Sequence, residues 1–142
     1  MQALGRSRGG FGTKVHAAVT GLGLPTVLLL SAGQEADVSH APALLGAVPA
    51  EAAVAAVIAD KGYDSKAVVA LVQAKGAEAV IPTLSTRKEQ RVIDTERYKD
   101  RNLAERFWHK VKQFRRVATR YDKTARNFLA FVHVASIMVL LR

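Results

Sequence analysis

Two acidic residues in this sequence stand where a protein could bring hard oxygen ligands together. Asp60 follows the apolar run Val54–Ala59 and precedes Gly62, so we predict it at the carboxyl end of a buried parallel strand, where open α/β sheets place ligand chemistry. Glu105 lies 45 positions later, in a helical stretch. If that helix packs beside the strand, both carboxylates can share Mg²⁺, as two-metal phosphoryl transfer requires. The alternative for Asp60 is a carboxylate that only caps the turn "DKGYDS".

The residues around Glu105 have a helical spacing. One face carries four polar residues within an arc of about 60°: Tyr98, Arg101, Glu105 and Lys112. The opposite face is apolar: Leu103, Phe107, Val111, Phe114 and Ala118. The apolar face would anchor the helix, while Tyr and Arg fix the Glu rotamer and Lys meets a phosphate. The alternative is an ordinary exposed face, on which Arg101 and Glu105 form an i,i+4 pair worth ~0.3 kcal/mol.

Positive charge is concentrated in one part of the chain. The net charge is +9, and residues 87–126 hold 14 Lys and Arg against 6 Asp and Glu, a balance of +8. Such a stripe attracts phosphate chains through counterion release, which makes nucleic acid the leading class of partner. A solvated helix face is the alternative, and membrane binding ranks lower because no broad uncharged apolar sector accompanies the charges.

The pattern of apolar runs and turn residues predicts one mixed α/β domain. We expect a flexible loop at 1–14, two strands joined at Gly21–Pro25, a short helix near Asp37, the strand at Val54–Ala59, a helix closed by Gly76, a strand ended by Pro82, a charged connection at Ser85–Thr95, a long helix from Tyr98 to Tyr121 and an apolar helix to the end.

Composition bears on the cellular location. The chain has no cysteine, so disulfides and thiolate metal sites are excluded, which fits a reducing cytoplasm. The apolar tail Phe128–Leu141 has 14 residues, and a bilayer span takes ~20. No apolar N-terminal segment marks the chain for secretion. We therefore expect a cytoplasmic protein without a membrane partner.

Three blocks of the sequence resemble the DDE transposases of bacterial insertion sequences: "GRSRGGFGTKVH", "VIADKGYDS" and "YKDRNLAERFWHKVKQFRRVATRYDKTARNFLA". The nearest branch is the group named after insertion sequence five, within the insertion-sequence-four superfamily. The Tyr-x2-Arg-x3-Glu-x6-Lys signature of that superfamily is met at every position by Tyr98, Arg101, Glu105 and Lys112. The resemblance extends over essentially all 142 residues.

The resemblance implies a ribonuclease H-like mixed sheet flanked by helices, with Mg²⁺ or Mn²⁺ serving DNA hydrolysis and strand transfer. Asp60 resembles the second catalytic Asp and Glu105 the catalytic Glu, so both are expected as metal ligands. Lys112 resembles a residue that contacts the end of the element, and Tyr98 and Arg101 match supporting positions. The residues expected to face DNA are Arg101, Lys112, Arg115, Arg116 and Arg120. Terminal inverted repeats and target DNA are the expected partners.

One feature departs from the family. The first catalytic Asp belongs to a strand upstream of the block that begins at Gly5, and no acidic residue occurs before Glu35. Neither Glu35 nor Asp37 stands at the matching position. We therefore expect an N-terminally truncated catalytic domain without its first catalytic strand, either a shortened copy or a downstream reading frame. It could pair with an upstream-frame product or an intact transposase, and alone it is expected to be inactive.

Two other functions remain open. The first is a non-catalytic DNA-binding remnant that modulates an intact transposase. The second is a general RNA-binding protein, which would bind with strong salt dependence and without preference for the ends of any element.

Overall fold

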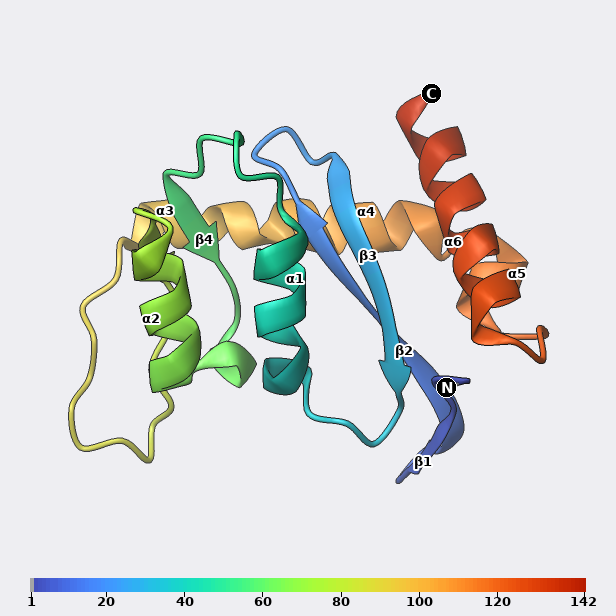
Figure 1. The fold of residues 1–142 in the computed structure, drawn as a ribbon, viewed down its shortest axis with the longest axis horizontal. Coiled ribbons are helices and arrows are strands. Elements are labelled where there is room, and N and C mark those ends of the chain that lie inside the picture. Colours follow the sequence, from blue (N-terminus) through green and yellow to red (C-terminus); the bar gives the residue numbers. More distant parts are fainter. Residues whose placement is uncertain (1) are drawn as a thin grey trace. The chain divides into compact units, whose positions relative to one another are not determined.

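The computed structural model describes residues 2–142, which form two compact units (Figure 1). The first unit joins the residues up to Glu35 to Leu103–Arg142, and the second consists of Ala36–Asn102. Helices and small sheets alternate in the chain, so the mixed α/β class predicted from the sequence is confirmed. The assignment of a single domain and the ribonuclease H-like topology stay predictions.

The first unit contains an antiparallel sheet in the order β1-β2-β3. Its strands are β1 (Gly5–Ser7), β2 (Gly10–Val19) and β3 (Pro25–Ala32). The predicted turn between β2 and β3 is confirmed: the amide of Gly23, at φ +78°, donates to the Thr20 carbonyl at 2.9 Å. The predicted loop at 1–14 is wrong where β1 and β2 form, while its flexibility stays a prediction and residue 1 lies outside the described residues. Its glycines serve a hairpin, in which Gly10 adopts φ +103° and β1 pairs with β2.

Three helices pack with this sheet: α4 (Asn102–Val111), α5 (Arg115–Ala118) and α6 (Ala125–Leu140). Their shared core with β3 consists of Leu28, Phe107, Val111, Val117, Phe128, Val132 and Ala135. The hydroxyl of Thr124 caps α6 by accepting the Asn127 amide at 3.3 Å. The terminal apolar helix is thereby confirmed. Among residues 2–142, no helix is long and apolar enough to cross a bilayer.

The predicted continuous helix from Tyr98 to Tyr121 is wrong. Helical hydrogen bonding of α4 persists through the Lys112 amide, which donates to the Trp108 carbonyl at 2.9 Å. Phe114 is then extended, at φ −79° and ψ 115°, and α5 begins after it. The break rotates the following residues, so that Val117 is 9% exposed and Ala118, expected on the apolar face, is exposed. No Pro or Gly marks this break, and the packing of Val117 in the core overrides the local helical pattern.

The second unit is built around a parallel pair, β4 (Ala56–Ile58) and β5 (Glu78–Val80). Its other elements are η1 (Asp37–His40), α1 (Ala41–Ala47), η2 (Lys61–Tyr63), α2 (Lys66–Ala74), α3 (Thr95–Tyr98) and η3 (Lys99–Arg101). The predicted strands and helices at Asp37, before Asp60 and up to Gly76 are confirmed, and Gly76 adopts φ +73° after α2. The strand before Asp60 is parallel as predicted, but it is half-buried because its described partner is β5 alone.

Candidate catalytic residues and their surroundings

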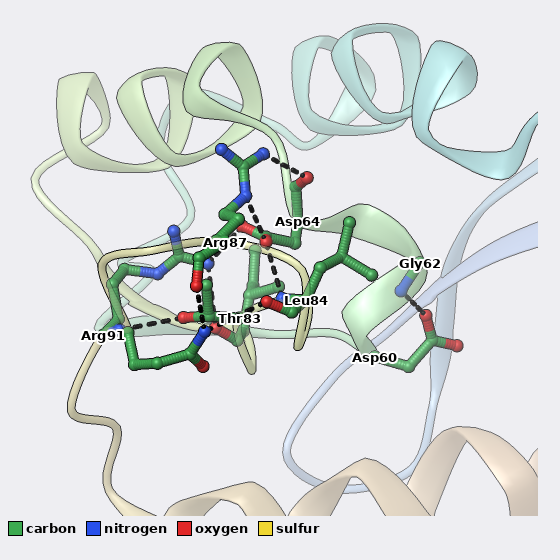
Figure 2. Close-up of polar contacts among 9 residues, drawn as sticks. Asp60, Gly62, Asp64, Thr83, Leu84, Arg87 and Arg91 are labelled. Atoms are coloured by element: carbon green, nitrogen blue, oxygen red, sulfur yellow. Dashed lines mark hydrogen bonds and ion pairs between the residues drawn. The ribbon is translucent and has the colours of Figure 1, made fainter.

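Asp60 lies two residues beyond β4, at the carboxyl end of that strand, and it is exposed. Its Oδ1 atom accepts the amide of Gly62 at 2.8 Å and caps the turn η2 (Figure 2). The capping role considered for this residue is therefore present. A Cβ atom added at Gly62 would lie 2.8 Å from the same Oδ1 atom, so the glycine leaves room for the carboxylate. Capping engages Oδ1 and is compatible with a ligand at Oδ2.

Asp64, at the other end of η2, has the opposite environment (Figure 2). Its side chain is fully buried. The Oδ2 atom accepts the Leu84 amide at 2.8 Å and Arg87 Nε at 2.7 Å, and Oδ1 accepts Arg91 Nη2 at 2.6 Å. Arg87 also donates to the Asp64 carbonyl at 3.0 Å. One carboxylate thus closes the segment that follows β5, and we call Asp64, Leu84, Arg87 and Arg91 the Asp64 cluster.

The Asp64 cluster fixes the charge of its carboxylate. Burial alone would raise the pKa of Asp64, but the hydrogen bonds from the Leu84 amide, Arg91 and Arg87 outweigh it and lower the pKa to about 2. Both oxygens are already bound to donors, so Asp64 is not available as a metal ligand. Thr83 supports the same segment, because its Oγ1 atom accepts the Arg91 amide at 2.9 Å.

Tyr63 lies between the two acidic residues in sequence. Burial, followed by the negative charges of Asp37 and Asp60, together raise its pKa to about 12. The phenol is therefore a neutral hydrogen-bonding group at neutral pH. It reports the charge of Asp60 without being a candidate for proton transfer at that pH.

Glu105 is exposed in the first turn of α4, and Lys112 is exposed just beyond its last turn. The opposite side of α4 is anchored as the sequence predicts, since Phe107 is 2% exposed and Val111 is 0% exposed. A carboxylate near a helix N-terminus is favoured by the helix dipole. Both candidates belong to the first unit.

Tyr98 and Arg101 belong to the second unit, at the end of α3 and in η3. They lie together: the guanidinium of Arg101 is 5.8 Å from the centroid of the Tyr98 ring, a cation–π contact. Asp60 is also in the second unit. The placement of its carboxylate beside that of Glu105 in the first unit stays a prediction.

The three arginines expected to face DNA after Lys112 differ in their contacts. Arg115 Nε donates to the Tyr121 hydroxyl at 3.3 Å, and Arg116 lies 4.2 Å above the Phe131 ring while remaining mostly exposed. Arg120 is half-buried. Its guanidinium donates to the carbonyls of Gln2, Ala3, Asp122 and Lys123 and to the Thr13 hydroxyl. Arg120 thus ties the N-terminal segment to the loop before α6, and its contact with DNA stays a prediction.

Comparison with known proteins decides the family. The family model described as "Transposase DDE domain" matches residues 5–140. The chain belongs to this family. A protein of Brucella ovis, provisionally named as a transposase for insertion sequence element IS6501, is 37% identical over 131 residues, which cover 92% of this chain and 98% of that relative. No solved structure matches the chain. The resemblance to DDE transposases is therefore confirmed, and membership implies DNA transposition by phosphoryl transfer on DNA.

DDE transposase domains generally use divalent metal ions, and the chemistry of two side chains fits this use. Asp60 and Glu105 are exposed carboxylates, and Mg²⁺ and Mn²⁺ prefer such oxygen ligands. Within residues 2–142, no three His, Cys, Asp or Glu side chains are grouped so as to hold a metal ion. The residues therefore fit a metal in kind, while a complete set of three ligands is not assembled from the described part of the chain.

Sequence reasoning missed the Asp64 cluster of this DDE domain. The sequence interpretation assigned a role to Asp60 in "DKGYDS" but none to Asp64, and it took Ser85–Thr95 only as a charged connection. The partners of Asp64 come 20 to 27 residues later, a separation that follows neither a helical nor a strand period. One pattern in the sequence could have indicated the cluster: an acidic residue, Asp64, follows one strand, and two arginines, Arg87 and Arg91, follow the next. Many acidic residues and arginines follow strands without forming ion pairs, so this pattern does not identify the cluster.

Proposed function

We propose that this chain takes part in DNA cleavage and strand transfer at the ends of an insertion sequence. Family membership supplies the reaction class. The observation that carries the assignment to residues is the environment of Asp60, an exposed carboxylate at the carboxyl end of a parallel strand with only Oδ1 engaged in capping the turn. The insertion-sequence-five group is the proposed branch, and the cytoplasm is the proposed location.

Asp60 and Glu105 are the proposed ligands for Mg²⁺ or Mn²⁺ in a ribonuclease H-like arrangement. A bound divalent ion would supply charge stabilisation to the phosphoryl oxygens during hydrolysis and strand transfer. The role of the chain is to present both carboxylates on fixed backbone: Asp60 on the turn after β4, and Glu105 on the exposed side of α4. Tyr98 is proposed to support Arg101 through their cation–π contact.

The proposed DNA contacts are Arg101, Lys112, Arg115 and Arg116. Lys112, Arg115 and Arg116 are exposed and closely spaced in sequence, which suits a phosphate backbone. Arg120 is left out of the proposal because its guanidinium donates to five acceptors within the chain. The terminal inverted repeats and target DNA are the proposed ligands.

The third acidic ligand implied by the family has no candidate before Glu35. We propose that it comes from outside residues 1–142, from an upstream-frame product or an intact transposase. A site completed in this way would make activity depend on the partner that carries the third carboxylate.

The test measures transposition in cells of an insertion sequence that carries a selectable marker. The cells express the gene products of that insertion sequence, including this chain. Asp60→Asn keeps an oxygen that can cap Gly62, and Glu105→Gln keeps the helix propensity, so both remove charge with little change in structure. We expect each to reduce transposition by about 100-fold or more, on the scale of a lost catalytic electrostatic contact. Glu89→Gln, an exposed carboxylate of the second unit, is the matched control and should retain full transposition. Equal transposition in all three variants would reject the assignment of Asp60 and Glu105.

A non-catalytic modulator is the second candidate, and the basic stretch of residues 87–126 favours it equally, because binding DNA through that stretch needs neither carboxylate. It predicts that the purified chain binds terminal inverted repeats in the presence of EDTA and that Asp60→Asn leaves both binding and modulation intact. Preference for RNA over the repeats in the same competition would instead support the RNA-binding alternative.

A further inference from the structure

We propose that Asp64 is a positioning residue for Asp60, which it holds through the turn η2 and the segment after β5. This inference rests on the proposed role of Asp60 as a metal ligand. In this proposal Asp64 does not bind the metal. Its function is to fix the orientation of the Asp60 carboxylate.

The first step is the geometry of the turn. Asp60 and Asp64 flank the three residues of η2, and the turn is closed at both ends by backbone hydrogen bonds. The Tyr63 amide donates to the Asp60 carbonyl at 3.0 Å, and the Asp64 amide donates to the Lys61 carbonyl at 3.1 Å. Since Asp60 Oδ1 accepts the Gly62 amide inside the same turn, its rotamer is set by the backbone of η2. Movement of Asp64 would therefore shift the backbone of η2, including the Gly62 amide that orients the Asp60 carboxylate.

The second step is the anchoring of Asp64. Its buried carboxylate receives one backbone amide and two guanidinium groups from the segment that leaves β5 (Figure 2). Arg91 Nη2 also donates to the Ile81 carbonyl at 3.1 Å, directly after β5. The exit of β5 is thus joined to the turn that follows β4. Because β4 and β5 are parallel, these exits lie at the same edge of the pair, which is where Asp60 emerges.

The third step is energetic. Charge-assisted hydrogen bonds to a fully buried carboxylate are strong, and leaving either arginine without that partner is costly. The neighbouring ion pair of Arg97 with Glu78 is exposed on both sides, so it contributes little. The two pairs in one unit therefore provide a matched comparison between a buried anchor and a surface contact.

Amide hydrogen exchange of the full chain tests the positioning directly and without metal. In Asp64→Asn, one carboxylate oxygen becomes an amide that faces Arg91, and the charged acceptor is lost. We expect the Leu84 and Gly62 amides to exchange about tenfold faster or more, while amides of α6 are unchanged. Glu78→Gln should change none of them. Faster exchange at Leu84 with unchanged exchange at Gly62 would overturn the inference, because Asp60 would then be oriented without Asp64.

A second variant and a second measurement protect the test. If Asp64→Asn unfolds the second unit, Arg87→Lys decides, since it keeps the charge but loses the paired bonds to Oδ2 and the Asp64 carbonyl. Mn²⁺ affinity, measured by electron paramagnetic resonance of free Mn²⁺ on folded protein, should weaken by about threefold to tenfold in either variant and not in Glu78→Gln. Unchanged Mn²⁺ affinity in both variants would overturn the inference. If the unmodified chain binds no Mn²⁺ without the partner proposed to carry the third carboxylate, exchange at Gly62 alone decides the positioning, while the metal role of Asp60 is decided by the transposition assay.

Discussion

Asp60 and Asp64 carry the same functional group four residues apart, and their surroundings separate their chemistry. Asp60 is exposed and one of its oxygens accepts the capping hydrogen bond from Gly62, whereas Asp64 is buried and both of its oxygens accept hydrogen bonds. A metal ligand must offer an accessible oxygen to an incoming ion, whereas an anchor is buried with its oxygens held by donors. At the scale of single residues, the division of labour in "DKGYDS" follows from burial and donors more than from residue type.

The pKa of Asp64 predicts how stability changes in acid. Its folded pKa of about 2 lies below the ordinary pKa of 3.8 for this side chain, so between these values the unfolded chain binds more protons than the folded one. The stabilisation is fully present above pH 4 and is lost as the pH falls through 2. We expect about 2 kcal/mol of unfolding free energy to disappear over this range, measured by urea unfolding of the second unit.

The control for this prediction is Asp64→Asn, which has no titrating group at the position. At pH 7 we expect it to be less stable by about 3 kcal/mol, because two arginines lose a buried charged partner. Between pH 4 and 2 its stability should fall less steeply than that of the unmodified chain. Parallel acid profiles for the two proteins would show that Asp64 is not the titrating anchor.

Tyr63 gives a second prediction at this scale. Burial, with the charges of Asp37 and Asp60, raises its pKa from 10.0 to about 12, so the folded state holds this proton more tightly than the unfolded state. The associated stability is present below pH 10 and is lost as the pH rises towards 12. In a pH titration followed at the phenolate absorbance band, Tyr63 should contribute a late component, meaning one that ionises near pH 12. This component should be missing in Tyr63→Phe.

Asp60→Asn provides the diagnostic comparison, since it removes a nearby negative charge and keeps an oxygen for the cap. The late component should then move to lower pH. If the Asp60→Asn substitution leaves the pKa of this component unchanged, burial and Asp37 alone account for the raised pKa of Tyr63. The carboxylate of Asp60 would then lie farther from the phenol than the structure places it.

At the scale of elements, the break between α4 and α5 reverses the roles of two neighbouring residues. Val117 is buried in the core of the first unit and Ala118 is exposed, whereas a continuous helix would place Ala118 on the apolar face. We expect Val117→Ala to lower the unfolding free energy by about 2 kcal/mol and Ala118→Lys to change it by less than about 0.5 kcal/mol. Thermal unfolding of the two variants provides the measurement. A large loss in Ala118→Lys would support the uninterrupted helix.

The same element shows what the sequence can predict. The apolar spacing of Phe107 and Val111 correctly identified the buried face of α4, and the turn at Gly23 and the helix end at Gly76 were read from residues with special backbone freedom. These signals are local. The break at Phe114 was missed because it depends on where Val117 packs against α6, and the β1–β2 hairpin was missed because glycine-rich segments are as common in loops as in turns.

The candidate site divides along the same line. Asp60 at the end of β4 was predictable, since a strand, a turn glycine and the resemblance agree on it. Asp64 was not, because its role arises from arginines more than twenty residues away that gather only when β4 and β5 pair. Local propensity and motif spacing describe residues close in sequence, so they cannot predict a contact between residues this far apart.

At the scale of the whole molecule, the net charge of +9 makes affinity for nucleic acid depend on salt, and the slope counts phosphate contacts. Lys112 is exposed, so Lys112→Met should remove one contact and reduce the slope of log K against log salt by ~0.9 on duplex DNA. Arg120 has the same formal charge, but its guanidinium donates hydrogen bonds to Gln2, Ala3, Thr13 and the loop before α6.

Arg120→Met should therefore leave the salt slope within experimental error and instead destabilise the first unit by about 2 kcal/mol, because several backbone carbonyls lose a charged donor. Faster amide exchange at Ala125, whose amide donates to the Gln2 side chain at 2.9 Å, would locate the damage. Fluorescence anisotropy on one duplex from 50 to 200 mM salt compares the two variants at equal folded fraction, in the range where phosphate contacts dominate affinity. Equal losses of slope would place Arg120 on the DNA and would mean that its hydrogen bonds to the N-terminal segment break when DNA binds.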